Sequence, residues 1–201
     1  MATMTPQRRD RLQHVLQHRQ IDLCVVLENV HDPHNISAVM RSCDAVGIME
    51  IFVINTTIPR HKKFGRRSSS SASKWIKVHQ YTDLAACMHE VASRYHQILC
   101  THLNESAKSL YELPLTLPTA LVFGNEHHGV SEEMLGYCTG NFIIPQVGMI
   151  QSLNISVACA VSIYEAFRQK LIAGHYAQQS LSETQASSLV QYWHEDRFLE
   201  S

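Results

Sequence analysis

The 201-residue chain lacks the features that identify several common protein classes. No uninterrupted run of about 18 apolar residues occurs, and no apolar core follows the basic N-terminal segment, so neither a membrane-spanning helix nor an export signal is expected. The six cysteines include no CxxC pair, which is typical of free thiols in a reducing compartment. We therefore expect a cytoplasmic protein with no membrane partner.

Phosphate-binding and metal-binding signatures are also missing. Neither GxxxxGK(S/T) nor GxGxxG occurs, which excludes the usual nucleotide-binding fingerprints. The nearest approach to a metal cluster is a set of four histidines, but no acidic residue or cysteine has zinc-site spacing with them: His31, His34, His127 and His128. No metal is expected.

An excess of positive charge is absent as well, because the formal net charge is -1. Any nucleic-acid site must therefore be local. Residues 5–19 predict a short helix with a basic outer face that carries Arg8, Arg9, Arg11 and Arg19. Residues 59–77 surround a serine run with a second group of basic side chains: Arg60, Lys62, Lys63, Arg66, Arg67, Lys74 and Lys77.

Short apolar runs alternate with helical patterns through the rest of the chain. Unbroken apolar runs are typical of parallel strands buried on both faces, so the alternation predicts an α/β fold with a parallel sheet flanked by helices. Ligands of such sheets bind at the carboxyl ends of the strands. The predicted strands are 23–27, 51–54, 97–101, 120–124 and 142–145, and the predicted helices are 36–46, 83–94, 131–137 and 152–173. A last helix is predicted over 182–199, where Trp193, Phe198 and Leu199 pack back on the body.

The predicted helix at 152–173 is apolar on nearly every side at its start, with Leu153, Ile155 and Val157 in its first turns. Such a helix requires burial on more than one side. A dimer interface and a deep core of one chain would both provide it, and the pattern does not choose between them.

The first polar constellation is NVHDPHNISAVMRSCDAVG, residues 29–47. Pro33 holds Asp32 extended, Asn35 can cap the helix and Gly47 can end it. On a helical wheel Arg41 points away from the buried stripe. Arg41 is therefore either a presented functional group or a solvent-facing partner of Asp44.

Two further constellations follow predicted strands. LVFGNEHHGV, residues 121–130, allows close backbone approach at Gly124, although a tight turn before a capped helix also explains its glycines. In FIIPQVGMIQSLNISVACAV, residues 142–161, Ser152 and Asn154 flank a helix start. Helix capping is the simplest explanation for either residue.

Together, Asn35-x5-Arg41, GNEHHG and IPQVGMIQSLNISVA resemble the three motifs of the SPOUT class in order and spacing. Over nearly the whole chain the sequence is similar to the TrmH family of tRNA (guanosine-2'-O)-methyltransferases. The resemblance implies a C-terminal deep trefoil knot, a homodimer, tRNA as substrate and S-adenosylmethionine as methyl donor, with guanosine 18 of the D-loop as target. The histidine pair and the serine run depart from the family's usual residues, which leaves the substrate range open.

The resemblance also carries functional positions onto this chain. Those of the donor site correspond to Thr101, Gly124, Asn125, Ile144, Met149, Ser152 and Leu153. The catalytic positions correspond to Asn35, Arg41, Glu126, Ser152 and Asn154. The basic residues Arg8, Arg9, Arg11, Arg60, Lys62, Lys63, Arg66, Arg67 and Lys74 would contact tRNA phosphates.

Methyl transfer to a ribose 2'-hydroxyl requires alignment of three atoms and removal of a proton. The resemblance assigns proton removal to Arg41, but a guanidinium is a poor base. Two alternatives are that Arg41 orients the target through a phosphate, and that His34 accepts the proton.

Two other functions fit the same motifs: a SPOUT methyltransferase of ribosomal RNA or of the tRNA anticodon, and a non-catalytic RNA-binding protein on the same scaffold. The first is less compatible with the chain's short terminal extensions. The expected organisation is a basic helical extension at 1–21, a methyltransferase domain at 22–174 and a helical extension at 175–201.

Overall fold

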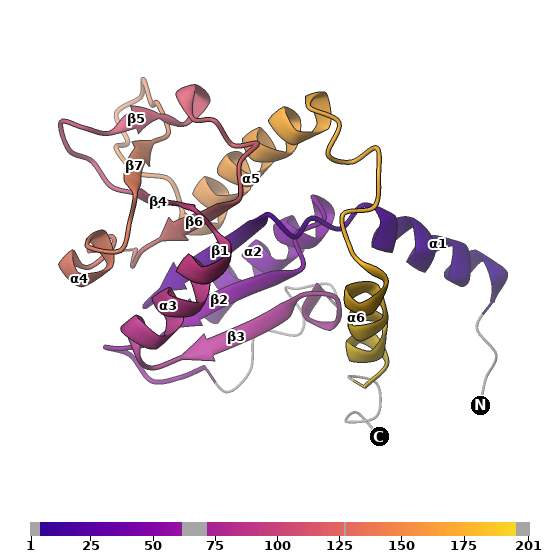
Figure 1. The fold of residues 1–201 in the computed structure, drawn as a ribbon. Coiled ribbons are helices and arrows are strands. Elements are labelled where there is room, and N and C mark those ends of the chain that lie inside the picture. The colour runs from indigo at the N-terminus through magenta and orange to yellow at the C-terminus, as the bar shows by residue number, and fades with distance from the viewer. Residues whose placement is uncertain (1–4, 62–71, 127, 196–201) are drawn as a thin grey trace.

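The protein is described by a computed structural model that covers residues 5–61, 72–126 and 128–195. A parallel sheet in the order β3-β2-β1-β6-β4-β7-β5 forms its centre (Figure 1). The strands are β1 (Leu23–Glu28), β2 (Glu50–Ile54), β3 (Lys77–Tyr81), β4 (Gln97–Thr101), β5 (Lys108–Ser109), β6 (Thr119–Phe123) and β7 (Gly140–Ile143). The predicted α/β class and parallel sheet are confirmed.

Helices cover both faces of the sheet. One face packs against α2 (Pro33–Ala45) and α5 (Ile155–Ile172), and the other against α3 (Leu84–Arg94) and α4 (Glu132–Leu135). Every residue of the central strands β1, β2 and β6 is buried, as expected for apolar runs between two helical layers. The predicted stripe on α2 is confirmed, because Ile36, Val39, Met40 and Cys43 are fully buried.

Two strands were not predicted, and several boundaries differ from the sequence prediction by two or three residues, as where α2 begins at Pro33 rather than at residue 36. β3 was missed because its sequence KVHQY is polar, and only its first residue lies in the predicted basic segment 59–77. As an edge strand it is only partly buried and needs no apolar run. The two-residue β5 is too short to leave a pattern. The last core helix begins at Ile155 rather than at residue 152, so Ser152 lies in the preceding loop.

The helices near the two ends of the chain pack together, as α1 (Pro6–Gln17) and α6 (Glu183–Glu195) in Figure 1. Leu12, Val15 and Leu16 of α1 contact the same cluster as Leu189 and Trp193 of α6. The predicted docking of the C-terminal helix is thereby confirmed for Trp193, whereas Phe198 and Leu199 lie outside the described residues.

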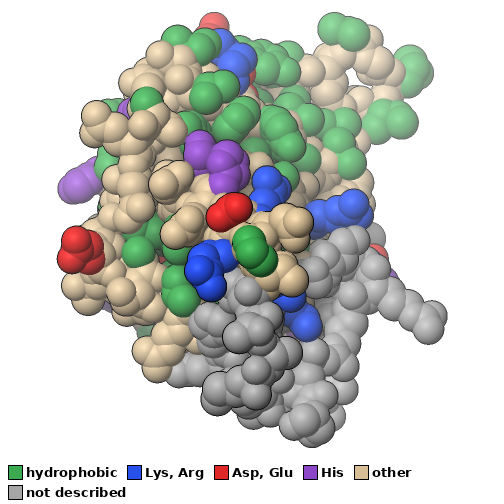
Figure 2. All heavy atoms as spheres, turned by 90° about the vertical axis from the view of Figure 1, so that its right-hand side faces the viewer, with side chains coloured by type: hydrophobic (Ala, Val, Ile, Leu, Met, Phe, Trp, Pro, Cys, Tyr) green, Lys and Arg blue, Asp and Glu red, His purple; other side chains and the backbone are tan. Residues whose placement is uncertain are grey.

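Arg19 was wrongly predicted on the basic outer face, because its side chain is fully buried. It binds the Asp44 carboxylate at 2.7 Å, donates to the Ile48 carbonyl at 3.0 Å and lies over the Trp193 ring. Arg8, Arg9 and Arg11 are exposed as predicted. Figure 2, which faces the side of the terminal helices, shows Lys and Arg groups across the middle of that surface.

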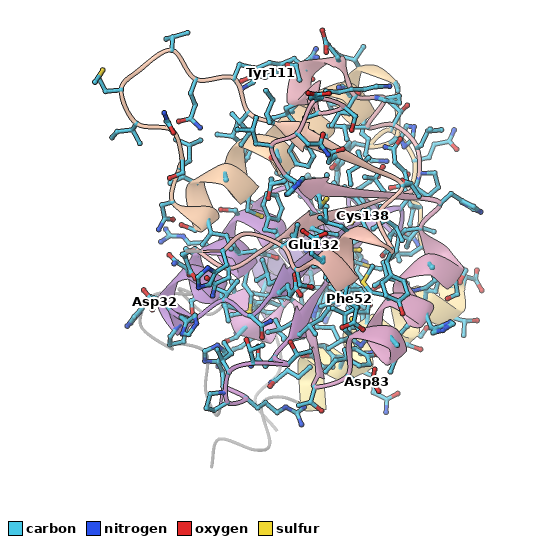
Figure 3. All side chains as sticks on the ribbon, turned by 90° about the vertical axis from the view of Figure 1, so that its left-hand side faces the viewer. Asp32, Phe52, Asp83, Tyr111, Glu132 and Cys138 are labelled. Carbon is cyan, nitrogen blue, oxygen red and sulfur yellow. The ribbon has the colours of Figure 1, made fainter. Side chains whose placement is uncertain are left out.

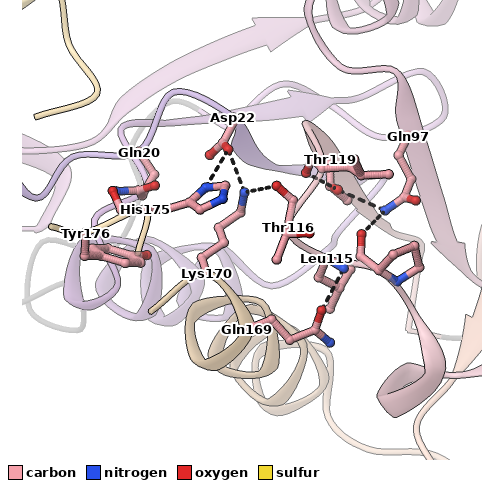
Figure 4. A network of polar contacts seen from close by, with 12 residues as sticks. Gln20, Asp22, Gln97, Leu115, Thr116, Thr119, Gln169, Lys170, His175 and Tyr176 are labelled. Carbon is pink, nitrogen blue, oxygen red and sulfur yellow. Dashed lines mark hydrogen bonds and ion pairs between the residues drawn. The ribbon is translucent and has the colours of Figure 1, made fainter. Parts of the chain in front are cut away.

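A buried polar network closes the amino end of the sheet (Figure 4). The Lys170 ammonium contacts Asp22 Oδ2 at 2.7 Å and donates to the Thr116 carbonyl at 3.2 Å. His175 Nδ1 lies 3.3 Å from the same carboxylate oxygen. This network ties the end of α5 to the residue preceding β1. No helix in the described part of the chain is long and apolar enough to span a membrane.

Candidate active site

A cavity of about 940 Å³ opens at the carboxyl ends of β4, β6 and β7. The ends of these strands and the loop between β7 and α5 form its walls, which is where an α/β sheet is expected to bind its ligand. Figure 3 views the molecule from the side that carries the arrowheads of β2 and β3 in Figure 1, and Asp32 and Glu132 both lie on this side.

The cavity contains six of the seven predicted donor-site residues: Thr101, Gly124, Asn125, Ile144, Ser152 and Leu153. Met149 does not line it. Its side chain is 98% exposed and borders a neighbouring groove of about 700 Å³. His102, Phe142, Gln146 and Ile150 also line the cavity and were not predicted. Each lies within two residues of a predicted or motif position, which is the signal that could have identified them.

Gly124 permits the tight turn that follows β6. A Cβ atom at this position would lie only 2.0 Å from the carbonyl carbon of Gly129, so no side chain fits there. Two backbone hydrogen bonds close the turn between Asn125 and Gly129, and Gly129 has a φ of 71°. The turn presents Asn125 and Glu126 to the cavity.

Three polar side chains from distant segments form a chain of hydrogen bonds at the cavity rim. Asn35 Nδ2 donates to Glu126 Oε1 at 3.0 Å, and Asn154 Nδ2 donates to Asn35 Oδ1 at 3.1 Å. The His31 N–H also donates to Glu126 at 3.4 Å. We call Asn35, Glu126 and Asn154 the rim triad. Each of the three motifs contributes one member, so the fold brings together residues that are far apart in sequence.

Of the two asparagines considered as helix caps, one caps its helix and the other does not. Asn154 caps α5, because its side-chain oxygen accepts from the Ser156 N–H at 2.9 Å, while its amide group still reaches Asn35. Asn35 does not cap α2, contrary to the prediction. Asp32 takes that role, in the extended conformation that Pro33 imposes, and accepts from the His34 N–H at 2.8 Å.

Arg41 is exposed on α2, as its helical position predicted, and it does not line the cavity of its own chain. The expected ion pair with Asp44 does not form, because Arg19 holds that carboxylate. Within residues 5–61, 72–126 and 128–195, no hydrogen bond or ion pair occupies the Arg41 guanidinium. This leaves the guanidinium available to an external anion.

None of the predicted RNA-contacting residues that the structure describes lines the cavity: Arg8, Arg9, Arg11, Arg60 and Lys74. Arg60 is exposed, and its Nε donates to Gln80 Oε1 at 2.8 Å, whereas Lys74 is partly buried in a short 3-10 turn. The predictions for Lys62, Lys63, Arg66 and Arg67 concern positions outside the described residues.

Charged and nucleophilic groups beside the cavity have structural partners. Glu28 is buried at the end of β1 and accepts two hydrogen bonds from Ser131, the N-cap of α4, at 2.9 and 2.6 Å. A hydrogen bond with Cys138 lowers the pKa of the Cys100 thiol, and this effect outweighs burial. Cys100 does not line the cavity and packs into the core beneath α3 and α4, so it is not a candidate nucleophile.

Within the described residues, no group of three or more His, Cys, Asp or Glu side chains is placed to hold a metal ion. His127, one of the four histidines considered from the sequence, lies outside the described residues.

Comparison with known protein families identifies the family to which the chain belongs. The SpoU rRNA Methylase family matches residues 22–164, which is most of the chain. The chain belongs to the SpoU rRNA Methylase family. The three motifs that resembled the SPOUT class all lie within the matched segment, and the matched segment contains the cavity and the rim triad.

Relatives in the SpoU family extend the match over nearly the full chain. The tRNA (guanosine(18)-2'-O)-methyltransferase of Thermus thermophilus is 41% identical over 195 residues, covering 96% of this chain and 98% of the relative. Its counterpart in Escherichia coli is 37% identical over 88% of this chain and 76% of its own length. The predicted membership of the TrmH branch is thereby confirmed.

Solved SpoU structures share the fold. The Aquifex aeolicus TrmH/SpoU tRNA modifying enzyme superposes with a TM-score of 0.87 at 36% identity, covering 94% of this chain and 96% of that one. AviRb from Streptomyces viridochromogenes, in complex with the cofactor AdoMet, gives a TM-score of 0.68 at 24% identity and covers 84% of this chain and 67% of its own. The second match concerns the fold alone.

Proposed function

We propose that the protein transfers a methyl group from S-adenosylmethionine to a ribose 2'-hydroxyl of tRNA, at guanosine 18 of the D-loop. The observation that carries the proposal is the rim triad, in which one residue from each motif meets at the mouth of the cavity. The names of the full-length relatives supply the substrate and the nucleotide.

The cavity suits a donor of this size and polarity. Its volume of about 940 Å³ lies within the range of pockets that hold cofactor-sized ligands, about 300 to 1,000 Å³. Ile144 and Leu153 offer apolar surface, while Thr101, Asn125 and Ser152 offer hydrogen-bonding groups. When bound, the donor supplies a methyl group already activated on a sulfonium centre.

The chain's own residues then have three tasks. The rim triad keeps the Glu126 carboxylate and the Asn154 amide in a fixed relation at the cavity mouth, which orients the incoming ribose. Ser152, exposed on the loop before α5, provides a further hydroxyl at the same wall. Arg41 binds the phosphate next to the target ribose, because an exposed guanidinium is well suited to a bidentate phosphate contact and poorly suited to proton removal.

RNA affinity comes from the basic surface. Arg8, Arg9 and Arg11 on α1, with Arg60 and Lys74 beside the sheet, contact tRNA phosphates and contribute binding energy without reading sequence. We assign Lys62, Lys63, Arg66 and Arg67 to the same surface from the sequence alone.

The protein acts as a homodimer in this proposal. The outer side of α5 leaves Val157, Tyr164, Leu171 and Ile172 between 47% and 75% exposed, and the neighbouring loop leaves Met149 98% exposed. In a dimer, a second copy covers this outer side of α5, while the other side of the helix packs into the core of its own chain. The dimer interface and the core of one chain would then each bury one side of the apolar helix. Sedimentation equilibrium measures this directly, and a monomer at micromolar concentration contradicts it.

We also propose the family's trefoil knot and a three-part organisation. After β7 the chain returns through residues 144–154 to α5, which packs against β6 and α2, and this path is compatible with a knot. The methyltransferase domain spans residues 22–174, with helical extensions at 1–21 and 175–201.

The experiment is methyl transfer from labelled S-adenosylmethionine to unmodified tRNA transcripts. We expect incorporation at guanosine 18, mapped by ribose-methylation sequencing, and none into a transcript that carries a 2'-deoxyguanosine at that position. Methylation of ribosomal RNA or of the anticodon loop instead contradicts the assigned substrate. Stable tRNA binding without any transfer contradicts an enzymatic function.

A further inference from the structure

Asn29 has an unusual backbone conformation. It follows β1, is 7% exposed and has a φ of 49°. Among the described residues that are not glycine, it is the only one with a positive φ. Asparagine tolerates the left-handed region better than other side chains, but a buried residue keeps this conformation only where its surroundings require it.

The Asn29 side chain holds the segment that follows β2. Its Oδ1 accepts from the backbone N–H groups of Thr56 and Thr57, at 2.9 and 3.0 Å. Its Nδ2 donates to Thr56 Oγ1 at 3.0 Å. The side-chain amide therefore binds residues 55–61 through three hydrogen bonds.

The Asn29 backbone connects two other segments. Its N–H donates to the Ile54 carbonyl at 2.8 Å, which continues the pairing of β1 with β2. Its carbonyl accepts from Asn125 Nδ2 at 2.8 Å, and Asn125 belongs to the turn that presents Glu126. One residue thus joins the segment after β2 to the turn after β6, on opposite sides of β1 in the sheet.

Residues 55–61 are held at further points. His61 Nε2 lies 2.8 Å from the Val30 carbonyl oxygen, and Asn55 Nδ2 donates to the Pro59 carbonyl at 3.3 Å. Arg60, a candidate phosphate contact, is bound to Gln80 of β3. Residues 55–61 therefore form a platform after β2 that is held by the Asn29 side chain and by a backbone hydrogen bond from Asn55 to Tyr81 of β3.

We propose that Asn29 is a positioning residue for RNA: it holds the 55–61 platform in register with the Asn125–Glu126 turn, so that phosphate-binding and ribose-orienting groups act on one substrate. The inference rests on the proposed function. Asn29 itself touches neither the donor nor the reacting atoms, because it is buried and does not line the cavity.

The decisive variant is Asn29→Gly. Glycine accepts a positive φ, so it removes the three side-chain hydrogen bonds without adding backbone strain, and the carbonyl that holds Asn125 remains. We expect the tRNA Kd and the KM for tRNA to rise about tenfold, from the loss of these bonds. The Kd for S-adenosylhomocysteine, measured by calorimetry, stays within about twofold, because the cavity walls are unchanged.

Two comparison variants separate positioning from stability. Asn29→Asp keeps both acceptor bonds to the platform and restores tRNA affinity to within about threefold of the wild type. Ser131→Ala removes the α4 cap and the hydroxyl bond to Glu28 at the same end of the sheet, while the backbone N–H bond to Glu28 remains, so it lowers the melting temperature without moving the tRNA Kd.

The outcomes also distinguish this inference from the proposed function. An unchanged tRNA Kd for Asn29→Gly, or an equal rise for Ser131→Ala, overturns the positioning role while methyl transfer by the wild type still stands. A wild type that binds tRNA but transfers no methyl group overturns the proposed function. The tRNA Kd of the Asn29→Gly variant, measured by filter binding, then still tests Asn29.

Discussion

The two ends of the sheet treat polar side chains in opposite ways. At the amino end the Lys170 ammonium is fully buried and bound by Asp22 and the Thr116 carbonyl. At the carboxyl end Glu126 and Ser152 are exposed, and on α2 the exposed Arg41 guanidinium has no hydrogen bond or ion pair within the described residues. The same sheet therefore has one end that is closed by its own charges and one end whose charges remain available.

This difference separates stability from function. Burial lowers the pKa of Lys170, and the hydrogen bond and charge of Asp22 act against that shift, so the network depends on both partners. Charges at the carboxyl end cost little to keep, because water still solvates them, and they can exchange water for a ligand. Substitution of the buried charges at the amino end should therefore reduce folding stability, and substitution of the exposed functional groups should reduce activity.

The largest effect is expected from Lys170→Met. Removing the ammonium leaves the partly buried Asp22 carboxylate without its lysine partner and with only His175 Nδ1 beside it among the described side chains, which costs about 3 kcal/mol of unfolding free energy. We place the value at the low end of the usual range because the Asp22 side chain is 22% exposed. Urea denaturation measures it, and the double variant Lys170→Met/Asp22→Asn should recover most of the loss. The Lys170→Met variant should unfold at a lower urea concentration than the wild type, while its folded fraction keeps the wild-type KM values.

Arg41→Ala tests an exposed charge on α2. We expect kcat to fall at least about a hundredfold, a loss of about 2.7 kcal/mol of transition-state stabilisation, with little change in melting temperature because the exposed guanidinium has no hydrogen bond or ion pair to lose within the described residues. His34→Ala, on the same helix, should keep most of its turnover. Single-turnover kinetics distinguish the two. A His34→Ala variant as inactive as Arg41→Ala, and still binding donor and tRNA, would assign proton removal to His34.

A smaller effect is expected from Arg60→Gln. Loss of one phosphate contact should weaken tRNA binding a few-fold at low salt and reduce the slope of log Kd against log salt concentration by about 1. The matched variant is Arg94→Gln, which lies on α3 and binds Glu50. An equal change of slope in both variants would show that general charge, and not this position, determines the affinity.

The smallest effect concerns acid stability at the far side of the sheet. Burial raises the pKa of Glu50, but the His79 hydrogen bond and the Arg94 charge outweigh it and hold that pKa below 4.5. The folded-state value is depressed, so its stabilisation is present above pH 4.5 and is lost as the pH falls through the folded pKa. Calorimetry between about pH 3 and 6 should show a shallower fall of melting temperature for Glu50→Gln. Parallel curves would contradict this.

Much of the fold could be predicted because burial leaves periodic patterns. The runs of β1, β2 and β6 and the stripe on α2 appear directly in the order of residues, since a fully buried strand is apolar over most of its length and admits polar side chains here only at its ends, as at Glu28 and Glu50. β3 escaped prediction because an edge strand with partial exposure accepts the polar sequence KVHQY. Arg19 was misassigned because nothing local distinguishes a buried arginine from an exposed one.

The resemblance to the TrmH family supplied the proposed members of the candidate site, Asn35, Arg41, Glu126 and Asn154, whereas helix capping, a tight turn and an exposed ion pair explained their positions equally well. Neither source gave the contacts, because the hydrogen bonds that join three of these residues span 91 and 119 residues of sequence. Asn29 gave no signal, since its importance lies in a positive φ and in partners that follow β2 and β6.

The order of residues by itself determined the parallel α/β class, the apolar runs of the central strands and the three motifs, because these depend on local geometry and on the mainly apolar composition of the core. Only the tertiary structure decided that Asp44 binds Arg19 rather than Arg41, that Asn154 both caps α5 and reaches Asn35, and that Asn29 joins two loops. The Asp44 carboxylate had two candidate partners, and folding brings Arg19 within reach. Asn154 and Asn29 each use separate polar groups for partners that are distant in sequence and become neighbours only in the folded chain.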